Sequence, residues 1–315
     1  MMQTIFMSHE SGTLTQVDEI REDCWVSLID PTQEELAAVA TECGVDVVDL
    51  SAALDVEEHS RVSRENGCVL ILVDAPTTEV EEHGSHHITI PIGILIAEKV
   101  IITVSLRKVP VLAEMESGVV RDINTSMKTR FTLQLLMRTA RSYLMALKDI
   151  EKTIHKQEAN LRVSTRNEAL MHMLTLEKSL VYISTSLVSN QQVLERLMRT
   201  STVPKYPEDD DLLEDTMIEN EQAMEMASIY SGILSGTMDA YASVIANNQN
   251  AIMKTLALIT IVLSIPTMIF SAYGMNVDLN GMPMALSVYG FIAVIGIAFV
   301  IALIVMFIFV RKKWF

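Results

Sequence analysis

The chain has 315 residues, of which 50% are hydrophobic, and its formal net charge is −16 at pH 7. Such an acidic chain has too few cations to neutralise phosphates, which excludes nucleic acid as a partner. An acidic surface attracts cations, although composition alone agrees equally well with acidity that only keeps the chain soluble. Between Thr255 and Val310 the only charged residue is Asp278, so we expect a soluble part of about 250 residues followed by a membrane part.

The cysteines and the N-terminus both indicate that the soluble part stays in the cytoplasm. Cys24, Cys43 and Cys68 are far apart and form no Cys-x-x-Cys pair, which favours reduced cysteines over a disulfide framework or a zinc site. The first ten residues, MMQTIFMSHE, lack the basic region and the apolar core of a signal peptide.

Residues 1–120 are expected to form a cytoplasmic domain of mixed α/β structure. Short aliphatic runs separated by turn-like stretches predict strands at Val69–Val73, His87–Leu95 and Lys99–Leu106. The segment Pro31–Cys43 has the pattern of a helix. We expect Asp30 to be its N-cap, Glu34 its capping-box partner and Gly44 its end.

The segment Glu81–His87, EEHGSHH, combines three histidines with two acids. Imidazoles and carboxylates are ligands for transition metals, so a metal cluster is one interpretation. The other is a polar hairpin tip. It is favoured because the segment lies between two predicted strands and contains Gly84.

Residues 121–254 are expected to form a long-helix cytoplasmic stalk. Phe131–Ala159 and Asn167–Met198 have apolar residues at helical spacing and contain no glycine or proline. Ser201–Asp211, which contains two prolines and a run of acids, predicts a break. From about Leu212 onward no proline occurs before Pro266, which predicts one helix of about 80 Å that continues from the soluble part into the membrane.

Residues 255–315 are expected to form the transmembrane domain, with spans at about 255–273 and 284–310. Both segments are long and apolar enough to cross a hydrocarbon core. Lys254 precedes the first span and Arg311–Lys313 follows the second, whereas the connector has no lysine or arginine. This distribution predicts a cell (inner or plasma) membrane protein with both termini in the cytoplasm.

One face of the first span and of the helix before it carries small or polar residues at spacings of three or four. We call this face the polar seam; its residues are Asp239, Ser243, Ala246, Asn250, Met253, Ala257, Thr260, Ser264, Thr267 and Ser271. Small and hydroxyl residues also serve simple packing of membrane helices. The continuity of the seam favours the other interpretation, a water-filled axis lined by several identical helices.

Tyr273-Gly274-Met275-Asn276 ends the first span. Gly274 can adopt backbone angles that other residues avoid, so it can end the helix. Asn276 supplies an amide oxygen that can accept hydrogen bonds from the water around an ion, and magnesium gives up that water reluctantly. By itself a Gly-x-Asn sequence is an ordinary helix end. The sequence contains no phosphate-binding glycine loop and no nucleophile motif, so we do not expect an enzyme.

The motif YGMN at the end of the penultimate span, Pro266 within that span, the second span and the terminal Lys-Lys-Trp-Phe together resemble the CorA family of magnesium channels. The resemblance is strong over residues 239–315 and rests on architecture elsewhere. It implies an α+β membrane protein in which an N-terminal cytoplasmic α/β domain is followed by a long helical stalk and two C-terminal transmembrane helices. It also implies a homopentamer that conducts hydrated magnesium passively into the cell, with cobalt or nickel as possible passengers.

The resemblance assigns roles to residues along the first span. Gly274, Met275 and Asn276 would form the selectivity filter, with Asn276 as the ligand of the hydrated ion. The implied pore-lining residues are Asp239, Asn250, Met253, Leu256, Ala257, Thr260, Ser264 and Thr267. Among them, Asp239 would form an acidic ring at the inner mouth, and Met253 and Leu256 would form a hydrophobic constriction.

The resemblance also implies that cytoplasmic magnesium closes the pore by binding between acids of neighbouring subunits. Asp215 lies at the matching distance before the pore helix, and its partner would be Asp49 or Asp55. The alternative is that these three residues are solvated surface acids.

The connector departs from the pattern of the family, whose outer loop commonly contains an acidic Met-Pro-Glu-Leu element. Here Met284 follows Met282-Pro283, and Asp278 is the only acid, which predicts a weak electrostatic attraction at the outer mouth. Two other functions remain open. One is zinc transport by a relative that resembles ZntB, and the other is a membrane-anchored sensor without transport.

Overall fold

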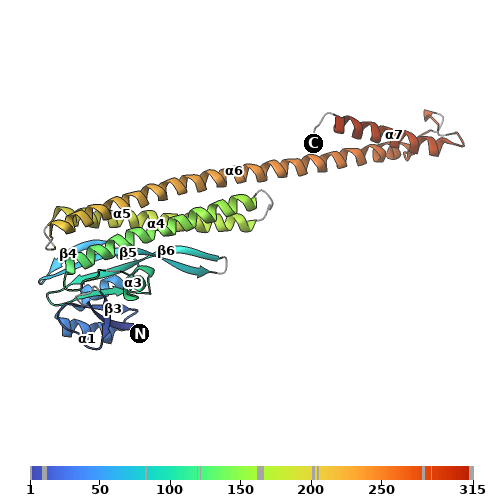
Figure 1. Cartoon of the computed structure of the whole chain (residues 1–315). Helices are drawn as coiled ribbons and strands as arrows, with labels where there is room; N and C mark the ends of the chain where they lie inside the picture. The colour runs from blue at the N-terminus through green and yellow to red at the C-terminus, as the bar shows by residue number, and fades with distance from the viewer. Residues whose placement is uncertain are drawn as a thin grey trace. The chain divides into compact units, whose positions relative to one another are not determined.

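The computed structural model describes residues 2–8, 13–81, 84–118, 120, 122–161, 167–200, 203, 206–278, 281–284 and 286–311. The chain divides into two compact units, Met1–Met238 and Asp239–Phe315. One helix, α6 (Pro207–Tyr273), contributes residues to both units. The first unit contains the described strands, and the second consists of the end of α6, a connector and α7 (Gly290–Arg311) (Figure 1).

The described strands form one sheet in the order β2-β1-β3-β7-β6-β5-β4. Their bounds are β1 Met2–Ser8, β2 Leu14–Val17, β3 Cys24–Ile29, β4 Arg61–Glu65, β5 Cys68–Glu81, β6 Gly84–Ile96 and β7 Ile101–Ser105. β3 and β7 run parallel, the other described pairs are antiparallel, and both central strands are buried throughout. The three predicted strands are confirmed: Val69–Val73 and His87–Leu95 lie within β5 and β6, and Lys99–Leu106 contains β7, which is shorter by two residues at its start and one at its end. The other four strands were not predicted; β4, with the sequence RVSRE, is a polar edge strand that gives no hydrophobic signal.

Helices cover both faces of the sheet. One face packs against α1 (Gln33–Cys43), α2 (Val47–Ser51) and the short 3-10 helix η1 (Ala52–Leu54). The other face packs against α3 (Pro110–Glu116), α4 (Lys128–Leu161), α5 (Asn167–Arg199) and the first turns of α6. Side chains of β5 alternate between the two layers: Leu70 and Leu72 belong to the first, and Ile71 and Val73 to the second.

The predicted start of α1 is wrong by two residues. The N-cap is Thr32, whose side chain accepts a hydrogen bond from the backbone N–H of Glu35, while the Glu35 side chain accepts one from the N–H of Thr32. An N-cap needs extended backbone, which Thr32 has. Asp30 instead lies in the left-handed region, with φ of 51°, because it turns the chain out of β3. Glu34 is therefore not the capping-box partner.

The long helices pack against one another around a separate hydrophobic cluster. The predicted helices Phe131–Ala159 and Asn167–Met198 are confirmed as α4 and α5, and the observed bounds lie within three residues of those predicted. Tyr143 of α4, Ile183 of α5 and Ala227 of α6 are among the buried members of the cluster. Apolar residues at helical spacing thus identified the core of the stalk correctly.

The helix α6 begins inside the segment that was expected to be a break. Pro207 is its first residue, where a missing N–H costs nothing. Asp209 accepts a hydrogen bond from the backbone N–H of Tyr206 at 3.0 Å, and the acids of the first turn interact favourably with the helix dipole. Residues 201–202 and 204–205 of the expected break lie outside the described residues.

A polar contact joins α5 to the exposed edge of β5. β4 pairs with β5 only as far as Leu72, which leaves the backbone of Asp74 without a strand partner on that edge. The side chain of Asn190 makes the two hydrogen bonds that a neighbouring strand would make. Its Oδ1 accepts from the Asp74 N–H at 2.9 Å, and its Nδ2 donates to the Asp74 carbonyl at 2.8 Å. Burial raises the pKa of the Asp74 carboxyl, while the Ser186 hydroxyl and His59 partly oppose the shift.

We expect Asp74→Asn to increase the free energy of unfolding at pH 7. The pKa of Asp74 is higher in the folded than in the unfolded state, so its contribution to stability is present at low pH and is lost as pH rises through the folded-state pKa. At a pH below 3.8, the ordinary pKa of an aspartate, residue 74 is neutral in both the wild type and the variant, and the difference in their free energies of unfolding should vanish. The pH dependence of this stability difference is measured by thermal unfolding of the full chain in detergent between pH 3.5 and 8. Asp18→Asn, at an exposed position, is the control. Destabilisation by Asp74→Asn at pH 7 would contradict it.

Candidate functional site

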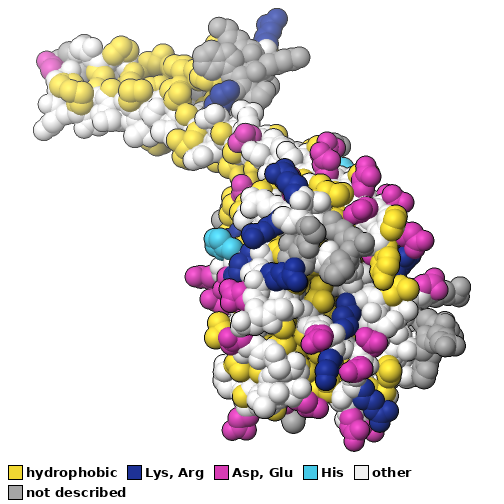
Figure 2. Space-filling view, turned by 90° about the vertical axis from the view of Figure 1, so that its left-hand side faces the viewer, with side chains coloured by type: hydrophobic (Ala, Val, Ile, Leu, Met, Phe, Trp, Pro, Cys, Tyr) yellow, Lys and Arg dark blue, Asp and Glu magenta, His cyan; other side chains and the backbone are white. Residues whose placement is uncertain are grey.

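Two helices among the described residues are long and apolar enough to cross a membrane, namely α6 and the Gly290–Phe309 part of α7. The most apolar window of α7 has a mean hydropathy of 3.3, and that of α6 has 2.0. Figure 2 shows the acidic and basic side chains over the first unit and mainly hydrophobic or uncharged groups over the second. The second span was expected to begin at Met284, but α7 begins at Gly290. Met284 cannot be helical because its φ is 63°.

A narrow stripe of α7 packs against α6 within the second unit. Among the described residues of α7, Gly290, Val294, Ala298 and Ala302 are buried, the last three at 7%, 1% and 8% exposure. Their spacing of four places them on one helix face, and the two alanines permit close approach of the helices. On α6, the partly buried residues Leu258, Val262, Ile265 and Ile269 recur at spacings of three or four. These positions identify the face of α6 that α7 covers.

The polar seam lies on a different face of α6. Of the predicted pore-lining residues, Ser264 is partly buried; the others, Asp239, Asn250, Met253, Leu256, Ala257, Thr260 and Thr267, are exposed in the single chain. The helix α7 of the same chain therefore does not bury the seam. It is available to water or to other copies of α6.

Three hydroxyl groups of the seam use their protons in hydrogen bonds within α6. Thr260 donates to the carbonyl of Leu256 at 2.9 Å, and Ser264 and Thr267 likewise donate to carbonyls one turn earlier, at 2.9 and 3.0 Å. A hydroxyl whose proton is used in this way offers its oxygen as an acceptor. Water bound to a cation points its protons outward, so a surface of acceptors matches a hydrated cation.

The predicted filter follows directly on the last turn of α6. The Gly274 N–H donates to the carbonyls of Phe270 and Ser271 at 2.9 and 3.1 Å, and the Met275 N–H donates to Ala272 at 3.4 Å. Gly274 does not adopt a left-handed conformation, contrary to the reason first given for its position. A Cβ atom there would lie 3.4 Å from the Phe270 carbonyl oxygen, which is ordinary van der Waals contact, so packing within the chain does not require a glycine at this position. Met275 and Asn276 are exposed.

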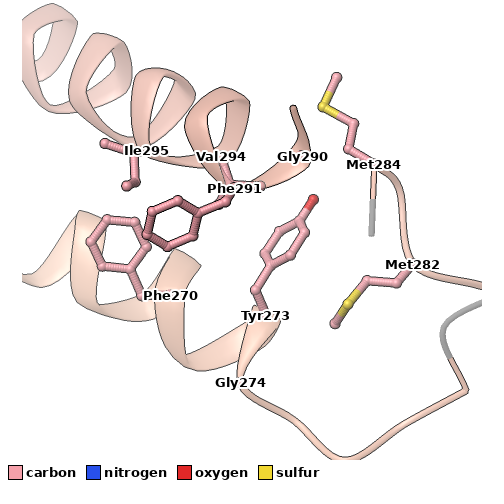
Figure 3. A pocket seen from close by; sticks show the side chains of 9 residues that line it. All are labelled: Phe270, Tyr273, Gly274, Met282, Met284, Gly290, Phe291, Val294 and Ile295. Carbon is pink, nitrogen blue, oxygen red and sulfur yellow. The ribbon is translucent and has the colours of Figure 1, made fainter. Parts of the chain in front are cut away.

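A cavity of about 550 Å³ lies beside the filter, between α6, the connector and α7 (Figure 3). Its lining is mainly apolar and includes Phe270, Tyr273 and Gly274 of α6, Met282 and Met284 of the connector, and Phe291 of α7. The Tyr273 hydroxyl donates to the Pro283 carbonyl at 3.0 Å. Nothing in the sequence pattern indicated this contact, because it joins a side chain to a backbone atom in a segment without periodicity.

The candidate regulatory acids are separate within the described chain. Asp49 lies on α2, where burial, Glu65 and Asp46 raise the pKa of its carboxyl, and Arg61 opposes them. Asp215 is not among the groups that act on Asp49. Among the described residues no group of three or more His, Cys, Asp or Glu side chains could hold a metal ion. Asp46 is the N-cap of α2 and is near Asp49 in sequence, whereas Glu65 belongs to β4 and approaches Asp49 only in the folded chain, so sequence alone did not indicate its effect.

The other two candidate acids, Asp55 and Asp215, are exposed, as is Asp239. Asp55 accepts a hydrogen bond from the Glu57 N–H at 3.0 Å. This local contact closes the turn after η1.

The histidine-rich segment is the tip of the β5–β6 hairpin, as the favoured interpretation predicted. Glu81 pairs with Gly84, and Glu82 and His83 lie outside the described residues. His87 Nε2 lies 3.4 Å from a carboxylate oxygen of Asp149, whereas His86 Nε2 lies 3.9 Å from Glu79. The two neighbouring histidines thus approach different acids, and the described part of the segment does not converge on one point.

A soluble α/β unit, a long helix and two apolar C-terminal helices define this chain as an integral membrane protein, which confirms the expected fold class. The chain belongs to the family of CorA-like Mg²⁺ transporter proteins, whose model matches residues 22–313. Because members of this family are ion transporters, the chain is not an enzyme.

A relative and a solved structure, both from one organism, match over nearly the whole chain. It is 29% identical to the cobalt/magnesium transport protein CorA of Methanocaldococcus jannaschii, across 99% of this chain and 100% of that protein. The solved complete structure of the magnesium transporter CorA from the same organism superposes with a TM-score of 0.83 and 27% identity, over 100% of this chain and 99% of the other. The cytoplasmic domain of ZntB from Vibrio parahaemolyticus superposes with a TM-score of 0.59, over 79% of this chain and 98% of that domain. Its 12% identity shows a shared fold alone.

Proposed function

We propose that the chain conducts divalent cations, and hydrated magnesium in particular, passively across a cell membrane. Family membership and the name of the full-length M. jannaschii relative, a cobalt/magnesium transport protein, support divalent-cation transport. The choice of magnesium rests on the neutral oxygen acceptors of the seam and filter. A small cation that keeps its water suits such groups better than the sulfur and imidazole ligands that bind zinc.

The observation that carries this proposal is the exposure of the polar seam on a face of α6 that α7 leaves open. A charged or polar stripe in a membrane helix is costly unless water or protein covers it. Five copies of α6 arranged around an axis would place the seam against water. The pore would then be lined by Asp239, Asn250, Met253, Leu256, Ala257, Thr260, Ser264 and Thr267.

The filter and the gate complete the proposed pathway. A ring of Asn276 amides, with Gly274 and Met275, binds the hydrated ion at the outer end. Met253 and Leu256, which are 57% and 55% exposed, form an apolar constriction that closes when it loses water. Magnesium bound between Asp215 of one chain and Asp49 or Asp55 of the next favours the closed state, because it relieves repulsion between acidic domains.

The proposed topology places both termini in the cytoplasm. Lys254 and Arg311 flank the two spans on one side, and Lys312 and Lys313, which lie outside the described residues, add to that charge. On this arrangement residues 1–120 form the cytoplasmic α/β domain, residues 121–254 the stalk and residues 255–315 the transmembrane pore domain.

Flux measurements with the purified full chain in liposomes test the proposal. With a negative-inside potential, external Mg²⁺ should enter and report on a trapped magnesium dye, and added Co²⁺ or Ni²⁺ should compete. Entry of Zn²⁺ with no entry of Mg²⁺ would identify a zinc transporter instead. A liposome that passes none of these ions would favour the membrane-anchored sensor.

A further inference from the structure

The connector is fixed to the end of α6 by a hydrogen bond that crosses the filter sequence. Tyr273 is the last residue of α6 and directly precedes Gly274. Its hydroxyl donates to the carbonyl of Pro283 at 3.0 Å, and its ring lines the cavity between the two spans (Figure 3). The bond therefore closes a loop that contains the three filter residues.

A second close contact holds the same part of the connector from the other side. The carbonyl of Met284 packs directly against the α-carbon of Gly290, so that a Cβ atom at Gly290 would overlap it. The same carbonyl accepts a hydrogen bond from the Ser287 N–H at 3.1 Å. The segment Met282–Met284 is thus held between Tyr273 of α6 and the first turn of α7.

The helix itself restrains the filter only weakly. The last helical bond before Asn276 is that of the Met275 N–H, and at 3.4 Å it is long. Asn276 is exposed. Closing a short loop removes many conformations from the residues inside it, and a binding group held in place loses less entropy when its ligand arrives. A bond across the loop is therefore an effective restraint on Asn276.

We propose that Tyr273 is the positioning residue of the selectivity filter. Its hydroxyl donates to the Pro283 carbonyl and holds the connector in place. Asn276 thereby keeps the position along the pore axis at which a ring of amides can bind a hydrated cation. This inference rests on the proposed function. Tyr273 thus joins the three filter residues as a residue that does not contact the ion and that acts on it through the loop.

The test compares Tyr273→Phe with Tyr289→Phe in the liposome assay. Phenylalanine keeps the ring in the cavity and removes only the donor. Tyr289 is a matched control, because it is the last residue of the connector, is 74% exposed and bonds the Ser287 hydroxyl through its backbone N–H rather than through its own hydroxyl. Uptake is measured over a range of external Mg²⁺, together with Na⁺ leak, and the amount of folded protein is determined by thermal unfolding in detergent.

For Tyr273→Phe we expect the half-saturating Mg²⁺ concentration to rise about threefold to tenfold. Each subunit loses one hydrogen bond, but the bond acts on the ion only through the loop, so the effect should be smaller than that of removing the five ligands themselves. The preference for Mg²⁺ over Na⁺ should fall by a similar factor, and the maximal rate per folded protein should not decrease. Tyr289→Phe should stay within about twofold of the wild type.

Two results would overturn the inference. One is a Tyr273→Phe protein whose half-saturating concentration and ion preference equal those of the wild type. The other is a lower maximal rate with both of these unchanged, since that indicates a role in folding only. If the wild type itself passes no divalent cation, the proposed function fails, and that outcome is distinct from both.

Discussion

Asn276→Ala should reduce the initial rate of Mg²⁺ uptake at low external concentration by at least about fiftyfold. In a symmetric pentamer the substitution removes five amide oxygens from one ring. If each loses about 0.5 kcal/mol, the low end for a hydrogen bond, the ring loses about 2.5 kcal/mol, and roughly 1.4 kcal/mol corresponds to a tenfold change. The exposure of Asn276 in the single chain leaves its amide free to face a common axis.

The matched control for this substitution is Asn248→Ala. Asn248 is also exposed on α6, but it lies off the polar seam, and its replacement should change uptake by less than about twofold. Both variants are measured in liposomes at equal protein content, with Mg²⁺ between the micromolar and millimolar ranges. Equal uptake by Asn276→Ala and the wild type would remove the filter from the proposed pathway.

Met253→Ser should produce a pore that stays open when the cytoplasmic side contains high Mg²⁺. The residue is 57% exposed on the seam, where five copies would form an apolar ring. A narrow apolar ring loses water and closes a pore, and hydroxyl groups in its place retain water. Each serine removes about two methylene-sized groups from the ring, and each such group contributes about 0.8 kcal/mol of apolar character. Even part of this change should lower the free-energy barrier to ion passage enough for about a tenfold higher flux.

Uptake with and without Mg²⁺ trapped inside the liposomes measures the effect on gating. The wild type should be inhibited by internal Mg²⁺, whereas Met253→Ser should retain its flux under both conditions. Ile252→Ser serves as the control, because Ile252 is 67% exposed on the neighbouring face of the same helix. A Met253→Ser protein that internal Mg²⁺ inhibits as strongly as the wild type would show that the constriction lies elsewhere.

The connector of this chain lacks the acidic Met-Pro-Glu-Leu element that is common in the outer loop of the family it resembles, and Asp278 is its only acid. Met284 occupies the place of the usual acid, has a φ of 63° and packs its carbonyl against Gly290. The side chain lines the apolar cavity rather than forming part of a charged rim. In the proposed pore, attraction of cations to the outer mouth would depend on Asp278 and on the amide ring, so we expect ion capture to rely more on binding than on long-range steering.

Sequence alone predicted the division into a charged part and an apolar part, the helices α4 and α5, and the end of the first long apolar helix at Tyr273. These features follow from composition and from apolar spacing along a single helix, which are local properties of the chain. The polar seam was likewise visible as a period of three or four. Sequence could not show whether α7 covers it, since that depends on which faces of two helices meet.

Features that depend on contacts between distant residues became visible only in the folded chain. The N-cap of α1 moved from Asp30 to Thr32 because the end of β3 forces Asp30 into a left-handed turn. The edge of β5 is completed by Asn190, 116 residues away. The bond from Tyr273 to Pro283 spans ten residues without periodicity. Such hydrogen bonds depend on the positions of individual atoms, which only the folded chain fixes.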